Sequence, residues 1–186
     1  RQVVIFVTFI GLSAVAAAEW IPVNSPVADG LEIEVVASAP ARTVLKLHVT
    51  GFFAHKVMIE GERYRIISHA DAHGFLRQGY PGLPHINTTL RVPHDGAVEA
   101  NVLSIEIEEF HLGPVAPSKG SITRSASPQQ IPYRFDSFYE TDEWFPAENI
   151  TLGRPFILRG VRGVNVQFQP FQFNPATKIL RVARSL

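Results

Sequence analysis

The sequence lacks cysteine altogether, so none of its 186 residues can form a disulfide bond, a thiolate metal ligand or a thiol nucleophile. It also lacks an excess of charge of either sign, because 17 Lys and Arg residues balance 17 Asp and Glu residues. A chain of zero net charge has no long-range attraction to nucleic acid or to an anionic membrane surface. We therefore predict no cysteine catalysis by this chain and neither a nucleic-acid nor a membrane partner.

Long windows with the apolar spacing of a helix are also absent, and 14 prolines and 13 glycines divide the chain into short segments. Apolar and polar residues instead alternate with period two, which is typical of half-buried strands. The clearest examples are residues 31–35, 103–107 and 164–168. Short strands with one polar face each predict two packed sheets, so we expect an all-β fold, an antiparallel β-sandwich with long loops.

Two hairpins can be placed on the sequence. Residues 57–66 predict two strands with a bend at residues 60–62, and the segment that ends at residue 181 contains a tight turn at residues 174–177. On the final hairpin the apolar side chains should face the core and the polar ones should face solvent. The residues expected inward are Val166, Phe168 and Leu180, and those expected outward are Gln167 and Gln169.

Motifs of enzymes are missing from the chain, which has no nucleophile elbow, phosphate-binding loop or zinc-protease helix. Glu108 and Glu109 are neighbouring carboxylates, but adjacent strand residues point to opposite faces and cannot share a substrate. His69, Asp71 and His73 have a spacing that could ligate a metal, yet no distant fourth ligand can be identified. We predict a non-catalytic chain with no metal site and no cofactor.

Two segments, a polar proline-framed loop at residues 114–133 and the run at residues 155–181, carry most of the motifs that match a known family. The matching residues are Gly79-Tyr80-Pro81-Gly82-Leu83-Pro84, Ala116-Pro117-Ser118-Lys119-Gly120, Arg124, Pro128, Pro132-Tyr133, Phe135, Phe145-Pro146, Pro155-Phe156-Ile157-Leu158-Arg159, Arg162-Gly163, Pro170, Asn174-Pro175, Thr177-Lys178 and Leu180-Arg181. In this order they resemble the N-terminal propeptide domain of gingipain-type cysteine endopeptidases. The resemblance covers residues 57–183.

The resemblance implies a chain that controls a secreted cysteine peptidase without being one. Its partner is then the cognate catalytic domain, downstream in the same precursor, which the propeptide inhibits and helps to fold. Family members are selective for basic side chains, and their pro-domain places a loop in the active-site cleft. Arg124 matches the arginine of that loop, and a guanidinium presents a planar fork of donors to a carboxylate.

The other residues that the resemblance assigns to this inhibitory loop flank Arg124. They are Ser118, Lys119, Gly120, Thr123 and Ser125. Lys119 is the second basic residue and matters if the partner prefers lysine. Gly120 is expected to turn the chain rather than to contact the partner.

The N-terminal segment has the pattern of an export signal. Residues 3–18 are almost entirely apolar, and the basic Arg1 precedes them. Ala16 and Ala18 before Glu19 fit cleavage after small residues. The run is shorter than the about 20 apolar residues that span a bilayer. An uncleaved membrane anchor or a buried first strand is the alternative.

We therefore expect two parts. Residues 1–18 form a signal peptide that is partial because it lacks the initiator Met. Residues 19–186 form a gingipain-propeptide-like β-sandwich domain, which we expect to be truncated at its C-terminal end. The precursor should be secreted, first to the periplasm and then to the extracellular space or the cell surface.

A different class of function stays open, namely an adhesion or carbohydrate-binding module of a surface protein on the same β-sandwich. Exposed aromatic rings would suit sugar stacking, although core or interface packing is their other role. The rings concerned are Phe138, Tyr139, Trp144 and Phe145.

Two arginines, Arg159 and Arg162, lie in a run otherwise suited to burial. We expect them to pair with carboxylates such as Glu106 or Glu108, because a buried charge requires a partner. Contact with the partner enzyme is the alternative.

The export signal gives the first testable prediction. The secreted protein should begin at or close to Glu19, because the apolar run ends in three alanines at that point. Mass spectrometry of the secreted protein measures this directly. Retention of residues 3–14 in the mature product would refute the signal peptide.

Overall fold

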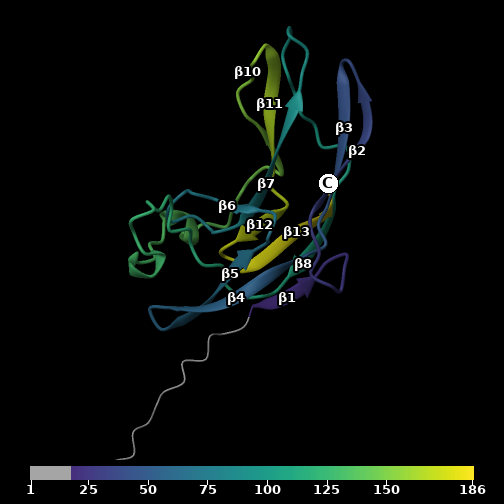
Figure 1. Cartoon of the computed structure of the whole chain (residues 1–186). Coiled ribbons are helices and arrows are strands. Elements are labelled where there is room, and N and C mark those ends of the chain that lie inside the picture. The colour runs from purple at the N-terminus through teal and green to yellow at the C-terminus, as the bar shows by residue number, and fades with distance from the viewer. Residues whose placement is uncertain (1–17) are drawn as a thin grey trace, which may run out of the picture.

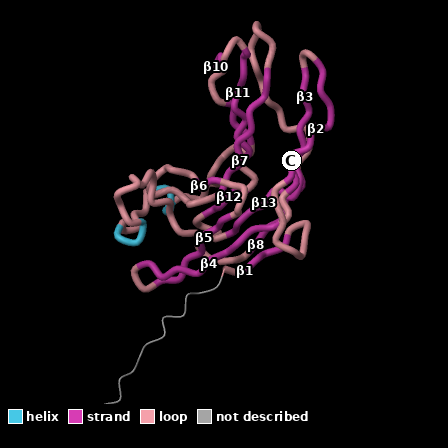
Figure 2. The backbone as a smooth tube through the Cα atoms, viewed as in Figure 1, coloured by secondary structure: helices cyan, strands magenta, loops and turns pink. Residues whose placement is uncertain are grey.

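The structure, a computed structural model, describes residues 18–186, and these form thirteen strands and two short 3-10 helices (Figures 1 and 2). The strands are β1 (Glu19–Pro22), β2 (Glu32–Ala39), β3 (Arg42–His48), β4 (Gly51–Ile59), β5 (Glu62–Ser68), β6 (His73–Gly74), β7 (Pro84–Arg91), β8 (Glu106–Phe110), β9 (Ile150–Leu152), β10 (Phe156–Leu158), β11 (Val161–Phe168), β12 (Phe171–Asn174) and β13 (Ile179–Ser185). The helices are η1 (Pro128–Gln130) and η2 (Ser137–Glu140). Neither helix approaches the length or apolar character that crossing a bilayer requires.

Hydrogen bonding divides the strands among three antiparallel sheets. The first has the order β1-β4-β5, the second β10-β11-β7-β6 with β9 beside β11, and the third β12-β13-β3-β2 with β8 beside β13. The predicted all-β antiparallel fold is confirmed, but there are three sheets where the sequence led us to expect two. Pro170 separates β11 from β12, and because proline has no N–H for a ladder, the chain passes there from one sheet to another.

Both predicted hairpin turns are confirmed. Glu60 and Gly61 join β4 to β5, and residues 175–178 join β12 to β13. In the second turn the carbonyl of Asn174 accepts from the Lys178 amide at 2.9 Å. Its side-chain Oδ1 also accepts from the Thr177 amide at 3.1 Å. Asn174 therefore fixes this turn with both its backbone and its side chain.

Phe52 of β4 lies at the centre of the core. It is fully buried, and its ring meets those of Phe171 on β12 and Phe110 on β8 edge-on, with centroids 5.6 and 5.3 Å apart. These rings pack the first sheet against the third, and the edge-on geometry is the favoured one for aromatic pairs. Val166 and Phe168 of the second sheet belong to the same cluster, so one core joins all three sheets.

The faces of β11 largely follow the predicted alternation. Val166 and Phe168 on β11 and Leu180 on β13 are buried as expected, although β11 belongs to another sheet and not to the final hairpin. The outward position predicted for Gln169 is wrong, because this side chain is only 5% exposed. Strand β9 covers the end of β11, and there the Gln169 Nε2 donates to Thr151 Oγ1 at 3.2 Å.

Two of the other alternating segments are less buried than we expected. Val35 on β2 is 58% exposed and Leu103 is 67% exposed. The β2–β3 hairpin extends away from the body (Figure 1), and β3 meets β13 only at its end, around His48 and Ser185. Leu103 lies outside β8, which begins at Glu106. Apolar alternation in these segments is therefore only partly a core pattern, since Leu31, Ile33 and Ile105 pack against the core while Val35 and Leu103 do not.

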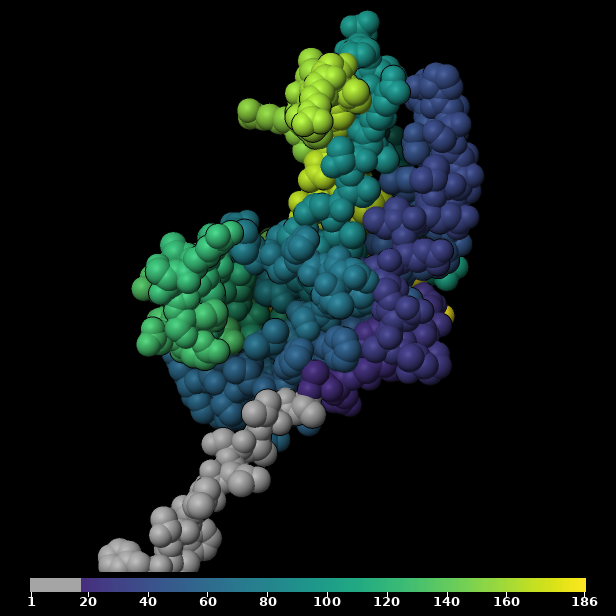
Figure 3. Space-filling view, viewed as in Figure 1, coloured from purple at the N-terminus to yellow at the C-terminus, as the bar shows by residue number. Residues whose placement is uncertain are grey.

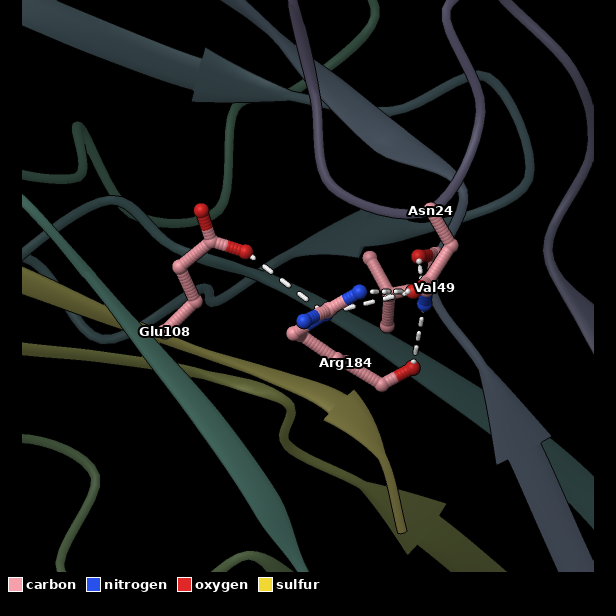
Figure 4. A network of polar contacts seen from close by, with 4 residues as sticks. All are labelled: Asn24, Val49, Glu108 and Arg184. Carbon is pink, nitrogen blue, oxygen red and sulfur yellow. Dashed lines mark hydrogen bonds and ion pairs between the residues drawn. The ribbon is translucent and has the colours of Figure 1, made fainter.

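The two ends of the described chain are tied together by a polar network around Asn24 and Arg184 (Figure 4). The Asn24 Nδ2 donates to the carbonyls of Val49 and Arg184, both at 2.9 Å. Its Oδ1 accepts from the Arg184 Nη2 at 2.9 Å, and the Arg184 Nε lies 3.6 Å from Glu108 Oε2. The network joins the segment after β1 to β8 and β13.

The expected pairing of Arg159 and Arg162 with Glu106 or Glu108 is wrong. Strand β8 pairs with β13 and not with β11, so its carboxylates meet other arginines. Glu109 lies 2.8 Å from Arg181, and Glu108 pairs with Arg184. Glu108 and Glu109 thus have separate partners. Arg162 instead donates to the carbonyls of Pro93 and Gly96, at 2.8 and 3.0 Å, and Arg159 is exposed in the turn between β10 and β11.

The core predicts the effect of truncating Phe168, which is 2% exposed. Phe168→Ala should lower the free energy of unfolding by about 3–5 kcal/mol, because it leaves a cavity among buried side chains. Urea denaturation measures the change. Gln167→Ala is the matched control on the opposite face, and it should change the free energy by about 0.5 kcal/mol or less. A loss below about 1 kcal/mol for Phe168→Ala would contradict the strand register.

Candidate functional site

The segment that precedes Arg124 is held on both sides by backbone hydrogen bonds, and we call residues 114–118 the strap. On one side the Arg65 amide of β5 donates to the Pro114 carbonyl, and the Ala116 amide donates to the Arg65 carbonyl, both at 2.8 Å. On the other side the Gly82 amide donates to Ala116 at 2.9 Å and the Ser118 amide donates to Tyr80 at 2.7 Å. The strap thus lies between β5 and residues 79–82 as an extra, buried strand-like segment.

Aromatic side chains from residues 133–146 support the strap. The Tyr139 hydroxyl donates to the Val115 carbonyl at 2.9 Å, and burial, with a further contribution from Tyr64, raises the pKa of Tyr139. The Tyr80 ring stacks on that of Phe138 with centroids 5.2 Å apart, and Phe145 meets the edge of Phe138. Tyr139 therefore stays neutral over the ordinary pH range and keeps its proton for the strap carbonyl.

The segment that follows, residues 119–133, is called the basic loop. It forms, with the residues after it, a green lobe at one side of the body in Figures 1 and 3. At its start Gly120 has φ of +79°, a left-handed conformation that glycine adopts without strain. The basic loop therefore begins with a left-handed residue at Gly120. The Ser118 Oγ anchors the same point by donating to the Phe75 carbonyl and accepting from the Gly120 amide.

Arg124 occupies the tip of the basic loop. The Ala126 amide donates to the Thr123 carbonyl at 3.0 Å, which closes a turn with Arg124 and Ser125 at its two central positions. The Thr123 and Ser125 hydroxyls lie 3.3 Å apart across this turn. Arg124 is exposed, and within residues 18–186 its guanidinium has no hydrogen-bond or ion-pair partner.

Lys119 differs from Arg124 because its ammonium group is already engaged. The Nζ donates to the Pro128 carbonyl at 2.7 Å, across the base of the basic loop. It also lies 4.2 Å from the centroid of the Tyr133 ring. Of the two basic residues in the segment, only Arg124 presents an uncommitted charge among the described residues.

A protein-family model, Propeptide_C25, matches residues 38–186. The chain belongs to this propeptide family. The resemblance to gingipain-type propeptides seen in the sequence is thereby confirmed, and so is the prediction that the chain is not itself an enzyme.

Curated relatives of the propeptide are gingipains of Porphyromonas gingivalis. Gingipain R2 is 45% identical over 105 residues, which are 56% of this chain and 14% of that protein. Gingipain R1 is 42% identical over 105 residues, 56% of this chain and 11% of that protein. The propeptide therefore spans only a small part of the length of these relatives.

Two solved structures resemble the propeptide. A complex of Porphyromonas gingivalis RgpB pro- and mature domains is 31% identical, with a TM-score of 0.79 over 82% of this chain and 80% of that one. A structure concerning the zymogenic latency of gingipain K, from the same organism, is 18% identical, with a TM-score of 0.70 over 89% of this chain and 93% of that one. At 18% identity, the second likeness supports the fold alone.

The residues considered for a metal site do not converge in the propeptide. His69 is buried, where its Nδ1 accepts from the Asp71 amide at 3.1 Å. The Asp71 Oδ2 accepts from the Leu31 amide at 3.1 Å. His73 faces His85 on the neighbouring strand, with ring centroids 6.4 Å apart. Among residues 18–186 no group of three or more candidate ligands comes together.

The four aromatic residues considered for sugar stacking pack within the propeptide. Phe138 is buried, and Phe145 lies against Tyr80 and Phe138. Tyr139 bonds to the strap, and the Trp144 ring lies 3.7 Å from the Arg181 guanidinium carbon. These contacts give all four a structural role, and no observation favours the adhesion or carbohydrate-binding module.

Sequence reasoning missed the residues that position the basic loop. Arg65 holds the strap through its backbone, and its Nε also donates to the Leu112 carbonyl at 3.3 Å. Tyr133 lies within a family motif, but the sequence alone assigned it no function in the basic loop. The polar tip of Tyr139 in an otherwise apolar setting was a usable signal, because a buried hydroxyl requires a partner.

For the signal cleavage site, Ala16 lies outside the described residues, while Ala18 is exposed and Glu19 begins β1.

The root of the basic loop gives a prediction about Gly120. A Cβ at this position would lie 3.0 Å from the Gln78 Cβ, in addition to adopting an unfavourable positive φ. Gly120→Ala should therefore lower the free energy of unfolding by about 2–3 kcal/mol, from backbone strain and overpacking together.

Gly113→Ala is the matched control, since Gly113 has φ of +84° and a Cβ there would meet no described residue within 4 Å apart from its chain neighbours. It should cost about 1 kcal/mol, from backbone strain alone. Equal losses in urea denaturation for the two variants would contradict the close packing of Gly120 on Gln78.

Proposed function

We propose that this domain is the propeptide of a gingipain-like cysteine-type endopeptidase precursor and that it keeps the peptidase latent through Arg124. The observation that carries the proposal is an exposed, uncommitted arginine at the tip of a loop whose base is fixed by the strap. Family membership and the likeness to a complex of pro- and mature domains support the cognate catalytic domain as the partner.

The chemistry of Arg124 suits an acidic specificity pocket. A guanidinium is always charged and presents its donors in a rigid fork that matches a carboxylate. Because the turn at residues 123–126 already holds the backbone around Arg124, less conformational entropy is lost when the loop enters a cleft. Arg124 then occupies the position of the residue that precedes a scissile bond.

The covalent link in the precursor strengthens the inhibition. A tethered inhibitor binds at a high effective concentration, so latency is greatest before the propeptide is cut from the catalytic domain. After cleavage, dilution and proteolysis of the released propeptide free the enzyme.

The signal peptide at residues 1–18 would bring the precursor out of the cytoplasm, and residues 19–186 would then form the β-sandwich domain proposed from the sequence. The packing of Phe52 on the first sheet against Phe110 and Phe171 on the third supports this layering.

Arg124→Ala tests the proposal. The substitution should leave the melting curve unchanged, because the side chain has no partner among the described residues, but it leaves the carboxylate of the pocket unpaired. Loss of one member of a buried charge pair costs about 2–5 kcal/mol, which corresponds to an inhibition constant raised about 30-fold to several thousand-fold. Steady-state inhibition of the Arg-selective catalytic domain measures the change.

Two further variants sharpen this test. Arg124→Lys should recover only part of the inhibition, because an ammonium lacks the planar fork. Arg63→Ala is the control, since Arg63 is an exposed arginine on β5 that is not part of the basic loop, and it should change little. Equal inhibition by the wild type and Arg124→Ala would remove Arg124 from the mechanism.

A further inference from the structure

Lys119 joins the two arms of the basic loop. Its Nζ donates to the carbonyl of Pro128, nine residues further along the chain, at 2.7 Å. A short hydrogen bond from a charged donor is among the stronger polar contacts in proteins. The same ammonium lies over the Tyr133 ring at 4.2 Å, a distance at which the ring attracts a cation. We call these three groups the clamp.

The two arms of the basic loop are held very differently without the clamp. The first arm begins at Ser118, which is fixed by its amide bond to Tyr80 and its hydroxyl bond to Phe75. The second arm contains only local hydrogen bonds, such as the Gln130 amide to the Ser127 carbonyl. In the described structure the next backbone bond from this arm to the body is the Asp136 amide to Gly79. Within residues 18–186, Lys119 therefore supplies the one hydrogen bond that ties residues 121–135 to the fixed arm.

We infer that Lys119 is a positioning residue, whose clamp on Pro128 and Tyr133 keeps the loop an inhibitor instead of a substrate. This inference rests on the proposed function of Arg124. Hydrolysis after Arg124 adds one water across the bond to Ser125 and leaves a carboxylate and an ammonium there. The clamp lies outside this bond on both sides, so it holds the two new ends together. A cut loop that stays in place continues to block the cleft. The clamp opposes the dissociation of the two arms.

The clamp also distinguishes two roles for Lys119. We considered from the sequence that Lys119 could itself enter the pocket of a lysine-selective partner. That role requires the ammonium to leave both the Pro128 carbonyl and the Tyr133 ring. An arginine at this position distinguishes the two roles. A guanidinium can also donate to a carbonyl and stack on a ring, so Lys119→Arg keeps the clamp.

The test uses residues 19–186 carrying Lys119→Met, which keeps a long apolar stem but loses the charge. Hydrogen exchange of the Ala126 and Gln130 amides, which donate to the Thr123 and Ser127 carbonyls, should become about tenfold faster when measured without any peptidase, while the melting temperature stays unchanged. With the Arg-selective catalytic domain, the fragment that ends at Arg124 should accumulate about tenfold faster, and inhibition should be lost as it does. Lys119→Arg should restore slow exchange and slow cleavage, and Tyr133→Leu should give intermediate values.

Failure of this inference differs from failure of the proposed function. If the wild type inhibits and Arg124→Ala does not, but Lys119→Met matches the wild type in exchange and in cleavage, the clamp has no role. If Lys119→Arg is cut after residue 119, the residue enters the pocket and the inference is wrong. If the wild type itself does not inhibit, the proposed function fails, and the exchange of the Ala126 and Gln130 amides still decides whether the clamp orders the loop.

Discussion

The backbone hydrogen bonds of the strap are the constraint on which the proposed function depends. Arg65 of β5 bonds to Pro114 and Ala116 on one side, while Gly82 and Tyr80 bond to the strap on the other. The segment cannot slide or rotate without leaving buried N–H and C=O groups unpaired, which costs about 1–3 kcal/mol for each group. A loop that leaves from such a base starts from one defined position and direction.

The rest of the fold explains why the strap has a firm support on each side. Phe52 packs β4 against the third sheet, and β5 is the hairpin partner of β4, so the core fixes the strand that carries Arg65. On the other side, the stacked rings of Tyr80 and Phe138 hold residues 79–82 near η2. The core therefore holds the strap in place. Arg124 beyond it is exposed, where adaptability to a partner is useful.

The sequence predicted the parts of the structure that are governed by local rules. Period-two alternation gave β11 with Phe168 inward, and turn chemistry gave both hairpins. Motifs in fixed order gave the family and placed Arg124 on a loop. The strand partners outside these two hairpins followed from none of these, because such pairing joins residues far apart in the sequence. The arginine pairs were therefore wrong, with Glu108 and Glu109 meeting Arg184 and Arg181.

The candidate site was predicted only in part, because its contacts also join residues that are far apart in the sequence. The resemblance placed both basic residues on the loop and matched Arg124 to its arginine, but only three-dimensional contacts show that Lys119 bonds to Pro128 while Arg124 stays uncommitted. Similarly, Gln169 appeared to belong to a solvent face until β9 was seen to cover it. Aromatic residues that could stack on a sugar proved to brace the strap, as the Tyr139 hydroxyl does.

The most direct measurement of the central claim is the mode of inhibition. Residues 19–186 should be titrated against the catalytic domain of the same precursor, with a small arginine substrate present at several concentrations. If Arg124 occupies the specificity pocket, one propeptide should block one active site, and the apparent inhibition constant should rise linearly with substrate concentration. An apparent inhibition constant that does not change with substrate concentration would mean that the propeptide binds elsewhere, and it would contradict the account.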